Sequence, residues 1–357
     1  MRRGYAKYLG DYISTATAQT ISLKYYSLGG VPSIFSLIQQ ARHNIALNSN
    51  LVFFEYGIND RHAIETDKFS LELAGKSLEG FIRSCQKVNP NCLIVILIFG
   101  VNLDSYYNNT CALSKLYTTI AGKYSLPVVN ITELLTKDQG INFIKTLYND
   151  ADEAHYTRPN GVKIVAKTIV KQLAKIGVIN NLKSEKCFPI PTIDKPLYPN
   201  HFANLAFFDD FASGNFFTKQ PKVGVFQNTV FREKHYTIEQ DNSLRFLLKG
   251  RLAALFIKSD FNDGLIEINF DSQHLVASTY CPWITKIRPH NINLITLPLS
   301  RFTTALDFAP VSISLSPEYT ENYELDYFKS EPQQKNPRKW KLSIIGIAYM
   351  GEIKPYS

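Results

Sequence analysis

The sequence predicts an α/β domain built on a parallel sheet, followed by an all-β domain. Up to about residue 184, short apolar runs alternate with segments of helical periodicity, which is the pattern of a parallel sheet covered by helices. Beyond residue 200 the helical periodicity disappears, and short β-rich segments are separated by Gly, Asn, Asp and Pro. Prolines cluster between residues 189 and 199, as in a linker. We therefore expect an α/β domain at 1–184, a Pro-rich linker at 185–200 and a jelly-roll-like β sandwich at 201–357.

The individual elements follow from the spacing of apolar residues. Apolar runs of strand length in the α/β part fall at 21–28, 51–54, 92–99 and 126–131. Helical spacing recurs at 5–18, 33–46, 67–88, 113–124 and 162–173. In the β part, we expect strands at 223–226, 244–248, 253–257, 265–270, 292–297, 311–315 and 342–349.

The composition is that of a globular protein with a mildly basic surface. Hydrophobic residues make up 45% of the 357 residues and charged residues 20%. Lys and Arg number 39 against 31 Asp and Glu, and the resulting charge of +8 is spread along the chain. The densest basic cluster, at 335–341, flanks Trp340, where a base could stack in principle. It resembles a solvated strand edge more closely, so we expect no nucleic-acid partner.

Location and covalent chemistry are constrained by what the sequence lacks. No apolar segment reaches the ~18 residues that a membrane span requires, and no apolar core of a secretory signal follows Met1. The cysteines are odd in number and scattered, which fits neither a disulfide framework nor a metal site: Cys85, Cys92, Cys111, Cys187 and Cys281. These features favour a cytoplasmic, reducing location, unless the N-terminus of the chain is truncated.

The segment 152–161 carries the clearest chemical signal. Asp152 precedes His155 by three residues, on an expected loop just ahead of an amphipathic helix whose first turn contains Pro159. Asp152 can accept a hydrogen bond from one imidazole nitrogen and leave the other to take a proton from a nucleophile. His155 is therefore the candidate general base and Asp152 its partner. Asp150 is a rival for the second role, and an ordinary solvated loop is the alternative interpretation.

Two further features follow expected strands. Gly29–Gly30 comes after the first strand, and the segment from Tyr56 to Asp60 comes after the second. Because ligands bind beyond the carboxyl ends of parallel strands, a Gly30 N–H and an Asn59 amide there could form an oxyanion hole. Asp60 either lines this pocket or holds the turn by hydrogen bonds. His62 could line the pocket or lie on the surface. Glu55 interrupts the second strand, and we expect it to pair with Arg61 or a nearby Lys.

These motifs together resemble the SGNH (GDSL-type) hydrolase family. Gly57-Ile58-Asn59-Asp60 is similar to its Gly-x-Asn-Asp block, residues 152–155 to its Asp-x-x-His block, and residues 28–33 to its Gly block. The resemblance covers about residues 5–180. It implies a flavodoxin-like parallel sheet and a serine esterase or O-acyltransferase that needs no metal or organic cofactor. With an appended β sandwich, it suggests a small-molecule or carbohydrate ester, in particular an O-acetyl group, as substrate.

The nucleophilic serine of that family has no counterpart here. The family places it in a Gly-Asp-Ser turn after a first, central strand, whereas Tyr12 occupies the serine position in Gly10-Asp11-Tyr12. No strand precedes the first expected helix, so we expect the chain to begin a few residues past the catalytic serine. Ser14 and Ser33 are poor substitutes, because neither lies on a strand-to-helix turn. The strands at 21–28 and 51–56 would then face a gap.

A protein of another class is the main alternative. The chain could be a non-catalytic carbohydrate-binding or assembly protein that keeps the fold without the nucleophile. Aromatic residues of the β part could form a sugar-stacking platform, although core packing is the commoner role of such residues: Tyr280, Trp283, Tyr319, Tyr323 and Trp340. The sequence does not predict an oligomeric state.

Overall fold

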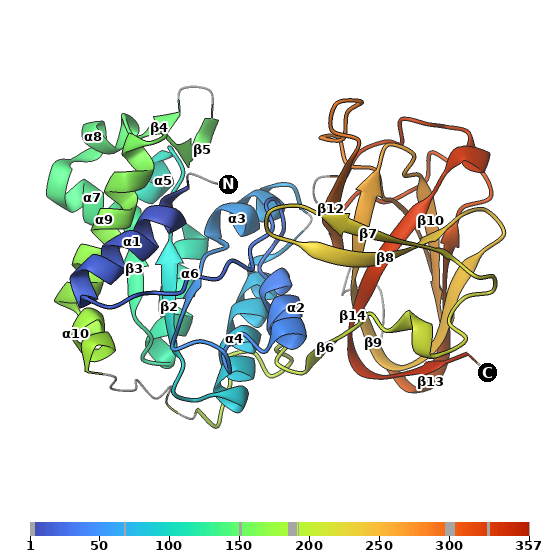
Figure 1. Cartoon of the computed structure of the whole chain (residues 1–357), viewed down its shortest axis with the longest axis horizontal. Coiled ribbons are helices and arrows are strands. Elements are labelled where there is room, and N and C mark those ends of the chain that lie inside the picture. Colours follow the sequence, from blue (N-terminus) through green and yellow to red (C-terminus); the bar gives the residue numbers. More distant parts are fainter. Residues whose placement is uncertain are drawn as a thin grey trace. The chain divides into compact units, whose positions relative to one another are not determined.

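The computed structural model describes residues 4–67, 69–149, 152–184, 191, 193–296, 304–326 and 329–356. Contacts within the chain define two compact units (Figure 1). The first comprises Met1–Tyr26 and Pro32–Ala203, and the second comprises Ser27–Val31 and Asn204–Ser357. The first is an α/β unit and the second an antiparallel β unit, as the sequence predicts.

The α/β unit contains a parallel sheet of three strands in the order β1-β2-β3. These are β1 (Leu51–Phe54), β2 (Leu93–Ile98) and β3 (Val128–Asn130). Leu51 pairs with Leu93, and Ile96 pairs with Val128. Every residue of β2 is buried, as expected for a central strand covered on both faces.

Helices cover both faces of this sheet (Figure 1). One face packs against α1 and α9, whose apolar residues share a core cluster with Leu93, Val95 and Leu97 of β2. On the other, Phe54 of β1 contacts the rings of Phe81 in α4 and Tyr117 in α6. The helices of this unit are α1 (Tyr5–Thr17), α2 (Ile34–His43), α3 (Gly57–Glu65), α4 (Leu71–Val88), α5 (Asp104–Tyr107), α6 (Ala112–Lys123), α7 (Ile131–Gln139), α8 (Ile141–Lys145), α9 (Asn160–Lys175) and α10 (Val178–Lys183). None of the described helices is both long and apolar enough to cross a bilayer.

The strand expected at 21–28 does not form. Residues 20–28 adopt neither helix nor strand, and β1 is an edge strand with no partner on its outer side among the described residues. The physical reason is that a strand needs a hydrogen-bonding neighbour, and residues 20–28 have no strand paired with them in the described sheet. The helix expected from residue 67 begins later, at Leu71, because the Ser70 hydroxyl caps it by accepting a hydrogen bond from Leu73 N (3.1 Å).

Residues 193–203, at the end of the first unit, pack against α4. The buried Glu79 carboxylate accepts hydrogen bonds from Leu197 N (2.8 Å) and Tyr198 N (2.6 Å). Arg83 donates to the carbonyl oxygen of Ile193 (2.8 Å). Gly80 allows the closest approach, since an added Cβ would lie 2.8 Å from Phe202 N.

The second unit is a network of antiparallel strands around one apolar core. Its strands are β6 (Leu205–Phe208), β7 (Lys222–Gln227), β8 (Arg232–Ile238), β9 (Ser243–Asp260), β10 (Leu265–Phe270), β11 (Gln273–Ser278), β12 (His290–Thr296), β13 (Ala305–Leu315) and β14 (Leu342–Pro355), with 3₁₀ turns η1 (Phe211–Ser213) and η2 (Pro337–Lys339). The main order is β11-β10-β13-β9-β14-β8-β7, with β12 on β9 and β6 on β14. The segments expected at 244–248 and 253–257 form one strand, β9, which pairs with β13 near its start and with β12 near its end.

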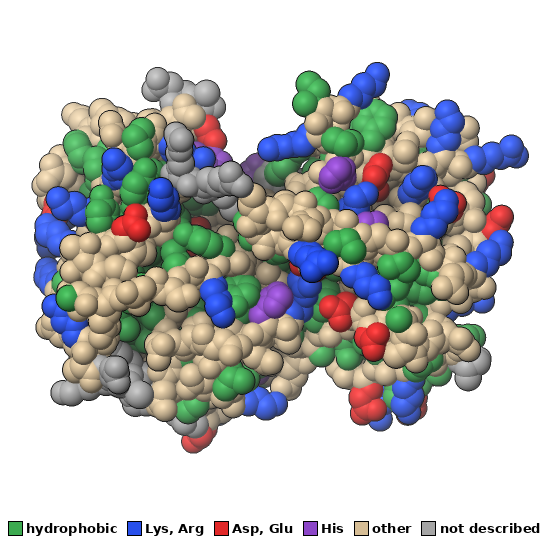
Figure 2. All heavy atoms as spheres, in the orientation of Figure 1, with side chains coloured by type: hydrophobic (Ala, Val, Ile, Leu, Met, Phe, Trp, Pro, Cys, Tyr) green, Lys and Arg blue, Asp and Glu red, His purple; other side chains and the backbone are tan. Residues whose placement is uncertain are grey.

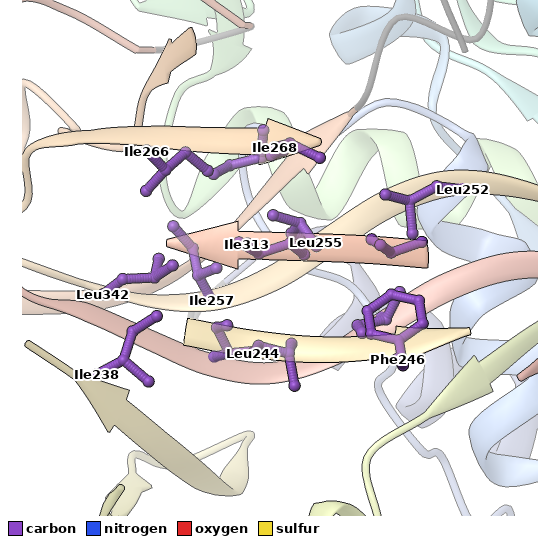
Figure 3. Packing of buried hydrophobic residues seen from close by; sticks show 14 of the residues in the cluster. Ile238, Leu244, Phe246, Leu252, Leu255, Ile257, Ile266, Ile268, Ile313 and Leu342 are labelled. Atoms are coloured by element: carbon purple, nitrogen blue, oxygen red, sulfur yellow. The ribbon is translucent and has the colours of Figure 1, made fainter. Parts of the chain in front are cut away.

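Aliphatic side chains from several strands fill this core (Figure 3). Leu244 and Phe246 of β9 lie in it with Ile268 of β10 and Ile313 of β13. Trp340 and Tyr280 are also buried, at 1% and 3% exposure, which agrees with core packing and excludes these two residues from the alternative, an exposed sugar platform. The Trp340 ring packs directly over Gly264, and burying this large apolar ring stabilises the core.

Two helical glycines should respond in opposite ways to alanine. We expect Gly80→Ala to lower the free energy of unfolding by about 1–3 kcal/mol, because its Cβ would push against the backbone of 202–203. Gly122→Ala in α6 should raise it by up to about 1 kcal/mol, because nothing lies within 4 Å and alanine favours the helix. Urea unfolding of both variants checks this, and similar effects at the two positions would contradict the packing of 193–203 on α4.

Candidate active site

Asp152 and His155 lie on a short strand rather than on the expected loop. β5 (Asp152–Tyr156) pairs antiparallel with β4 (Tyr148–Asn149), and α9 begins four residues after β5, at Asn160. The alternation of the strand turns Tyr156 into the core, where it stacks on Tyr148, and leaves the His155 side chain 65% exposed. Core packing of Tyr156 therefore fixes the strand that presents His155.

The two side chains form the pair expected from their spacing. His155 Nδ1 is hydrogen-bonded to Asp152 Oδ2, and Asp152 Oδ1 accepts a hydrogen bond from Ala154 N (2.8 Å). Partial burial opposes ionisation of Asp152, but the hydrogen bonds from Ala154 and His155 outweigh it and lower its pKa. With Nδ1 held by a carboxylate, Nε2 is the nitrogen that can accept a proton. Asp150, the rival partner, lies outside the described residues.

The strand β5, which carries Asp152 and His155, contacts the segments that follow β1 and β2. Asn102 N, after β2, donates to the carbonyl oxygen of Glu153 (2.8 Å). Arg61 of α3 reaches the Glu153 carboxylate (3.5 Å) and forms a closer ion pair with Glu65 (2.6 Å). Among the described residues, Glu55 forms no ion pair with Arg61 or with a lysine, so the expected pairing is not found. These contacts bring α3 and β5 together at the carboxyl end of the parallel sheet.

Asn59 lies in the first turn of α3. The helix begins at Gly57, directly after β1, so the expected tight turn is a helix start. The first N–H groups of a helix have no partner within it, and they carry its positive dipole end, so this position favours negative charge. Asn59 is half-buried, and its role as an oxyanion donor stays a prediction. His62 is exposed on the same helix, where its contact with a ligand likewise stays a prediction.

Asp60 is buried in the interior and joins three helices. Its carboxylate accepts hydrogen bonds from Ser33 N, just before α2 (2.6 Å), and from the Tyr117 hydroxyl of α6. Burial raises the pKa of Asp60 to about 6, although the bonds from Ser33 and Tyr117 oppose that rise. With 0% exposure, Asp60 is placed to hold the start of α2 rather than to contact a ligand.

Gly30, Ser33 and Ser14 are the remaining candidates from the sequence. Gly30 has a positive φ of 74° and falls in 27–31, which groups with the second unit, so its role beside His155 stays a prediction. Ser33 is fully buried. The Ser14 hydroxyl, within α1, accepts a hydrogen bond from Ile21 N (3.2 Å). Throughout the described part of the chain, no serine hydroxyl is hydrogen-bonded to His155.

Glu55 is a buried titratable residue of this region, and its burial was not predicted from the sequence. It lies at the end of β1, and burial, followed by the nearby charge of Asp60, raises its pKa to about 7. Its charge also acts on Tyr5 and Tyr156. The sequence signal was a carboxylate at the end of an apolar strand, which we interpreted as half of an ion pair.

Other kinds of site find little support in the described residues. No three His, Cys, Asp or Glu side chains gather there as a metal site would require. Cys85, Cys92, Cys111 and Cys281 are free thiols, and Cys187 lies outside the described residues. Figure 2 shows basic side chains dispersed over the visible face with acidic ones among them, unlike the continuous stripe of a nucleic-acid-binding surface.

No protein-family model and no curated relative matches the sequence. Among solved structures, the chain is similar to a two-domain esterase (CEX) active on acetylated mannans and co-crystallised with mannopentaose. That match covers 100% of this chain and 87% of the esterase, with a TM-score of 0.62 and 16% identity. It spans both units and shows the fold: a parallel α/β sheet with helices, followed by an antiparallel β domain.

Two further solved structures match parts of this chain. A putative GDSL-like lipase from Parabacteroides merdae matches 48% of this chain and 82% of its own, with a TM-score of 0.39 and 14% identity. A family two carbohydrate esterase from Cellvibrio japonicus matches 43% of this chain and 36% of its own, with a TM-score of 0.23 and 10% identity.

Asp60 provides a test of how this site is held. We expect Asp60→Ala to lower the free energy of unfolding by about 2–4 kcal/mol, because Ser33 N–H and the Tyr117 hydroxyl would lose their buried acceptor. Asp60→Asn should cost less, because its amide oxygen can still accept from Ser33. Urea unfolding of both variants and the wild type at pH 7 measures the difference. Equal losses in the two variants would contradict the acceptor role.

The pH dependence should separate the wild type from Asp60→Asn. The folded pKa of about 6 exceeds the ordinary 3.8, so between these values the folded protein retains a proton that the unfolded chain releases. The contribution of Asp60 to stability is therefore greatest below about pH 4 and declines as the pH rises to about 6. Asparagine does not titrate, so the wild type should lose stability relative to Asp60→Asn across this window. Parallel curves would show that the pKa of Asp60 is not raised.

Proposed function

We propose that this chain belongs to an ester hydrolase or O-acyltransferase of the SGNH kind, acting on O-acetyl groups of a carbohydrate. The observation that carries the proposal is the hydrogen-bonded Asp152–His155 pair at the carboxyl end of a parallel sheet. The full-length similarity to an esterase active on acetylated mannans supports the substrate class, through the fold alone.

In the proposed reaction, His155 is the general base. Its Nε2 takes the proton from a serine hydroxyl as that oxygen attacks the ester carbonyl, and later gives the proton to the leaving alcohol. Asp152 is kept ionised by the hydrogen bond from Ala154, so it stabilises the imidazolium that forms. The Asn59 amide is a proposed donor to the oxyanion. Water or a second alcohol then accepts the acyl group.

The proposed nucleophile is a serine outside these 357 residues. Ser33 is buried and Ser14 lies within a helix, so neither can reach a substrate at His155. The outer edge of β1 supports the idea, because no described strand lies beside it and a further parallel strand there would pair with its N–H and C=O groups. Leaving such groups unpaired costs on the order of 1–3 kcal/mol for each one that is buried. A strand ending in Gly-Asp-Ser would both complete the sheet and supply the nucleophile.

The competing proposal is a non-catalytic carbohydrate-binding or assembly protein. It is favoured by the absence of any serine hydroxyl bonded to His155 in the described part of the chain. It differs from the enzyme in one readily tested respect, namely whether the gene encodes a strand and a Ser immediately before Met1. Sequencing that region decides which protein should be assayed.

Activity should require His155 in a protein that includes the upstream strand. We expect His155→Ala to lower kcat/KM for p-nitrophenyl acetate and for acetylated mannan by about 10²–10⁴-fold, which is the usual contribution of a general base. Asp152→Asn should also lower kcat, because it removes the charge that favours the imidazolium. Steady-state ester hydrolysis and acetate release measure these losses.

A matched control is His43→Ala, since His43 is the last residue of α2 and its ring contacts that of Tyr26. It should keep wild-type kcat/KM. Full activity in His155→Ala, or an upstream region with no strand and no serine, would overturn the enzyme proposal and leave the binding protein.

A further inference from the structure

The strand that carries the Asp152–His155 pair has very little sheet of its own. In the described structure β5 pairs only with β4, where Tyr148 lies opposite Tyr156 and Asn149 opposite Asp152, and the register shifts between these two pairs. A two-stranded ribbon of this kind is only marginally stable by itself in water. Contacts with the rest of the α/β unit must therefore fix where β5 lies, and with it where the pair lies.

Two hydrogen bonds join this ribbon to the segment that follows the central strand β2. Asn102 N donates to the carbonyl oxygen of Glu153 in β5 (2.8 Å). The Tyr148 hydroxyl of β4 donates to the carbonyl oxygen of Gly100 (3.0 Å). The first bond joins two backbone groups, so it does not depend on the side chains at these positions. The second depends on one side-chain oxygen, so a single substitution can remove it.

The acceptor of the Tyr148 hydroxyl is itself held in place. Gly100 lies two residues after β2, whose residues are all buried. Gly100 N donates to the Thr132 hydroxyl of α7 (3.1 Å), and a Cβ added at Gly100 would overlap that oxygen. The carbonyl oxygen of Gly100 is therefore a fixed point at the carboxyl end of the parallel sheet. A hydrogen bond to it sets the position of the ribbon relative to the sheet.

The Tyr148 hydroxyl contributes something that its ring does not. Tyr148 is 3% exposed, and its ring stacks on that of Tyr156 with the centroids 4.8 Å apart. Ring stacking tolerates sliding, whereas a hydrogen bond weakens steeply when it is misaligned. A buried hydroxyl without a partner is costly, so the ribbon settles where Tyr148 reaches Gly100. Because Tyr156 directly follows His155, sliding of the two rings would displace the imidazole.

We propose that Tyr148 is a positioning residue of the candidate active site, whose hydroxyl holds β5 where His155 Nδ1 meets the Asp152 carboxylate. The effect on catalysis rests on the proposed function, whereas the effect on the pair does not. Without the hydroxyl, the ribbon keeps its packing but loses its fixed point, and the bond between His155 and Asp152 is weakened. A misplacement of about 1 Å can cost about 10²-fold in the rate of a reaction that depends on orientation.

Nuclear magnetic resonance of the His155 ring in the 357-residue chain tests the effect on the pair. The ring ¹⁵N signals, assigned with His155→Ala, should move in Tyr148→Phe towards their positions in Asp152→Asn, which lacks the carboxylate. The matched control is Tyr124→Phe, which also removes a buried tyrosine hydroxyl, here bonded to Glu79 (2.7 Å), and should leave the His155 signals unchanged. Unchanged signals in Tyr148→Phe, or equal changes in both tyrosine variants, would overturn the proposal.

A second variant keeps the proposal testable if Tyr148→Phe does not fold. Thr132→Val has nearly the same shape as the wild type but removes the oxygen that fixes Gly100 N. It should move the His155 ring signals in the same direction, because the acceptor of the Tyr148 hydroxyl is then no longer held. Wild-type positions of these signals in Thr132→Val would contradict the role of Gly100 as the fixed point.

Kinetics of a protein that includes the upstream strand test the effect on catalysis. Tyr148→Phe should lower kcat for p-nitrophenyl acetate about tenfold and leave KM unchanged. Because Tyr148 acts through the pair, adding this change to Asp152→Asn should cost little more, whereas independent effects would multiply and so refute the positioning role. A wild type without esterase activity would instead overturn the proposed function, and the His155 signals would still decide the role of Tyr148.

Discussion

Backbone hydrogen bonding around β2 is the constraint on which the α/β unit depends. All of its residues are buried, and it pairs in parallel with β1 on one side and β3 on the other. A parallel sheet must be covered on both faces, which α1 and α9 do on one side and α4 and α6 on the other. The carboxyl ends of β1 and β2 then fall beside β5, and this places the Asp152–His155 pair.

The site is held by groups that take no part in the proposed chemistry. Asp60 joins the start of α2 to α3 and α6 through a carboxylate with no exposure, so the cost of burying it is offset only while Ser33 and Tyr117 donate. Tyr156 plays the corresponding role for β5, because its ring stacks on Tyr148 in the core while His155 faces outward. Packing on one side of each element thus orients polar groups on the other.

Much of this architecture could be predicted from local patterns, and the failures have a common physical origin. β2 and α9 were predictable because their apolar spacing matches their burial. The spacing of Asp152 and His155 likewise revealed their pairing. The strand at 21–28 failed because an apolar run does not say whether a neighbour exists to pair with it. The partners of Asp60, 27 and 57 residues away in the chain, were not predictable because no local pattern records such a distance.

The open edge of β1 connects stability to function. Edge strands are commonly protected by charges, prolines or bulges, yet Leu51–Phe54 contains none of these. Glu55 is the first carboxylate after β1, and burial raises its pKa to about 7. Near neutral pH it is therefore only partly ionised and protects the edge only weakly. An apolar edge of this kind favours the addition of a strand. In the proposed enzyme, the added strand ends in the nucleophile, so the interaction that satisfies the backbone of β1 also brings the serine to the carboxyl end of the sheet, where His155 lies.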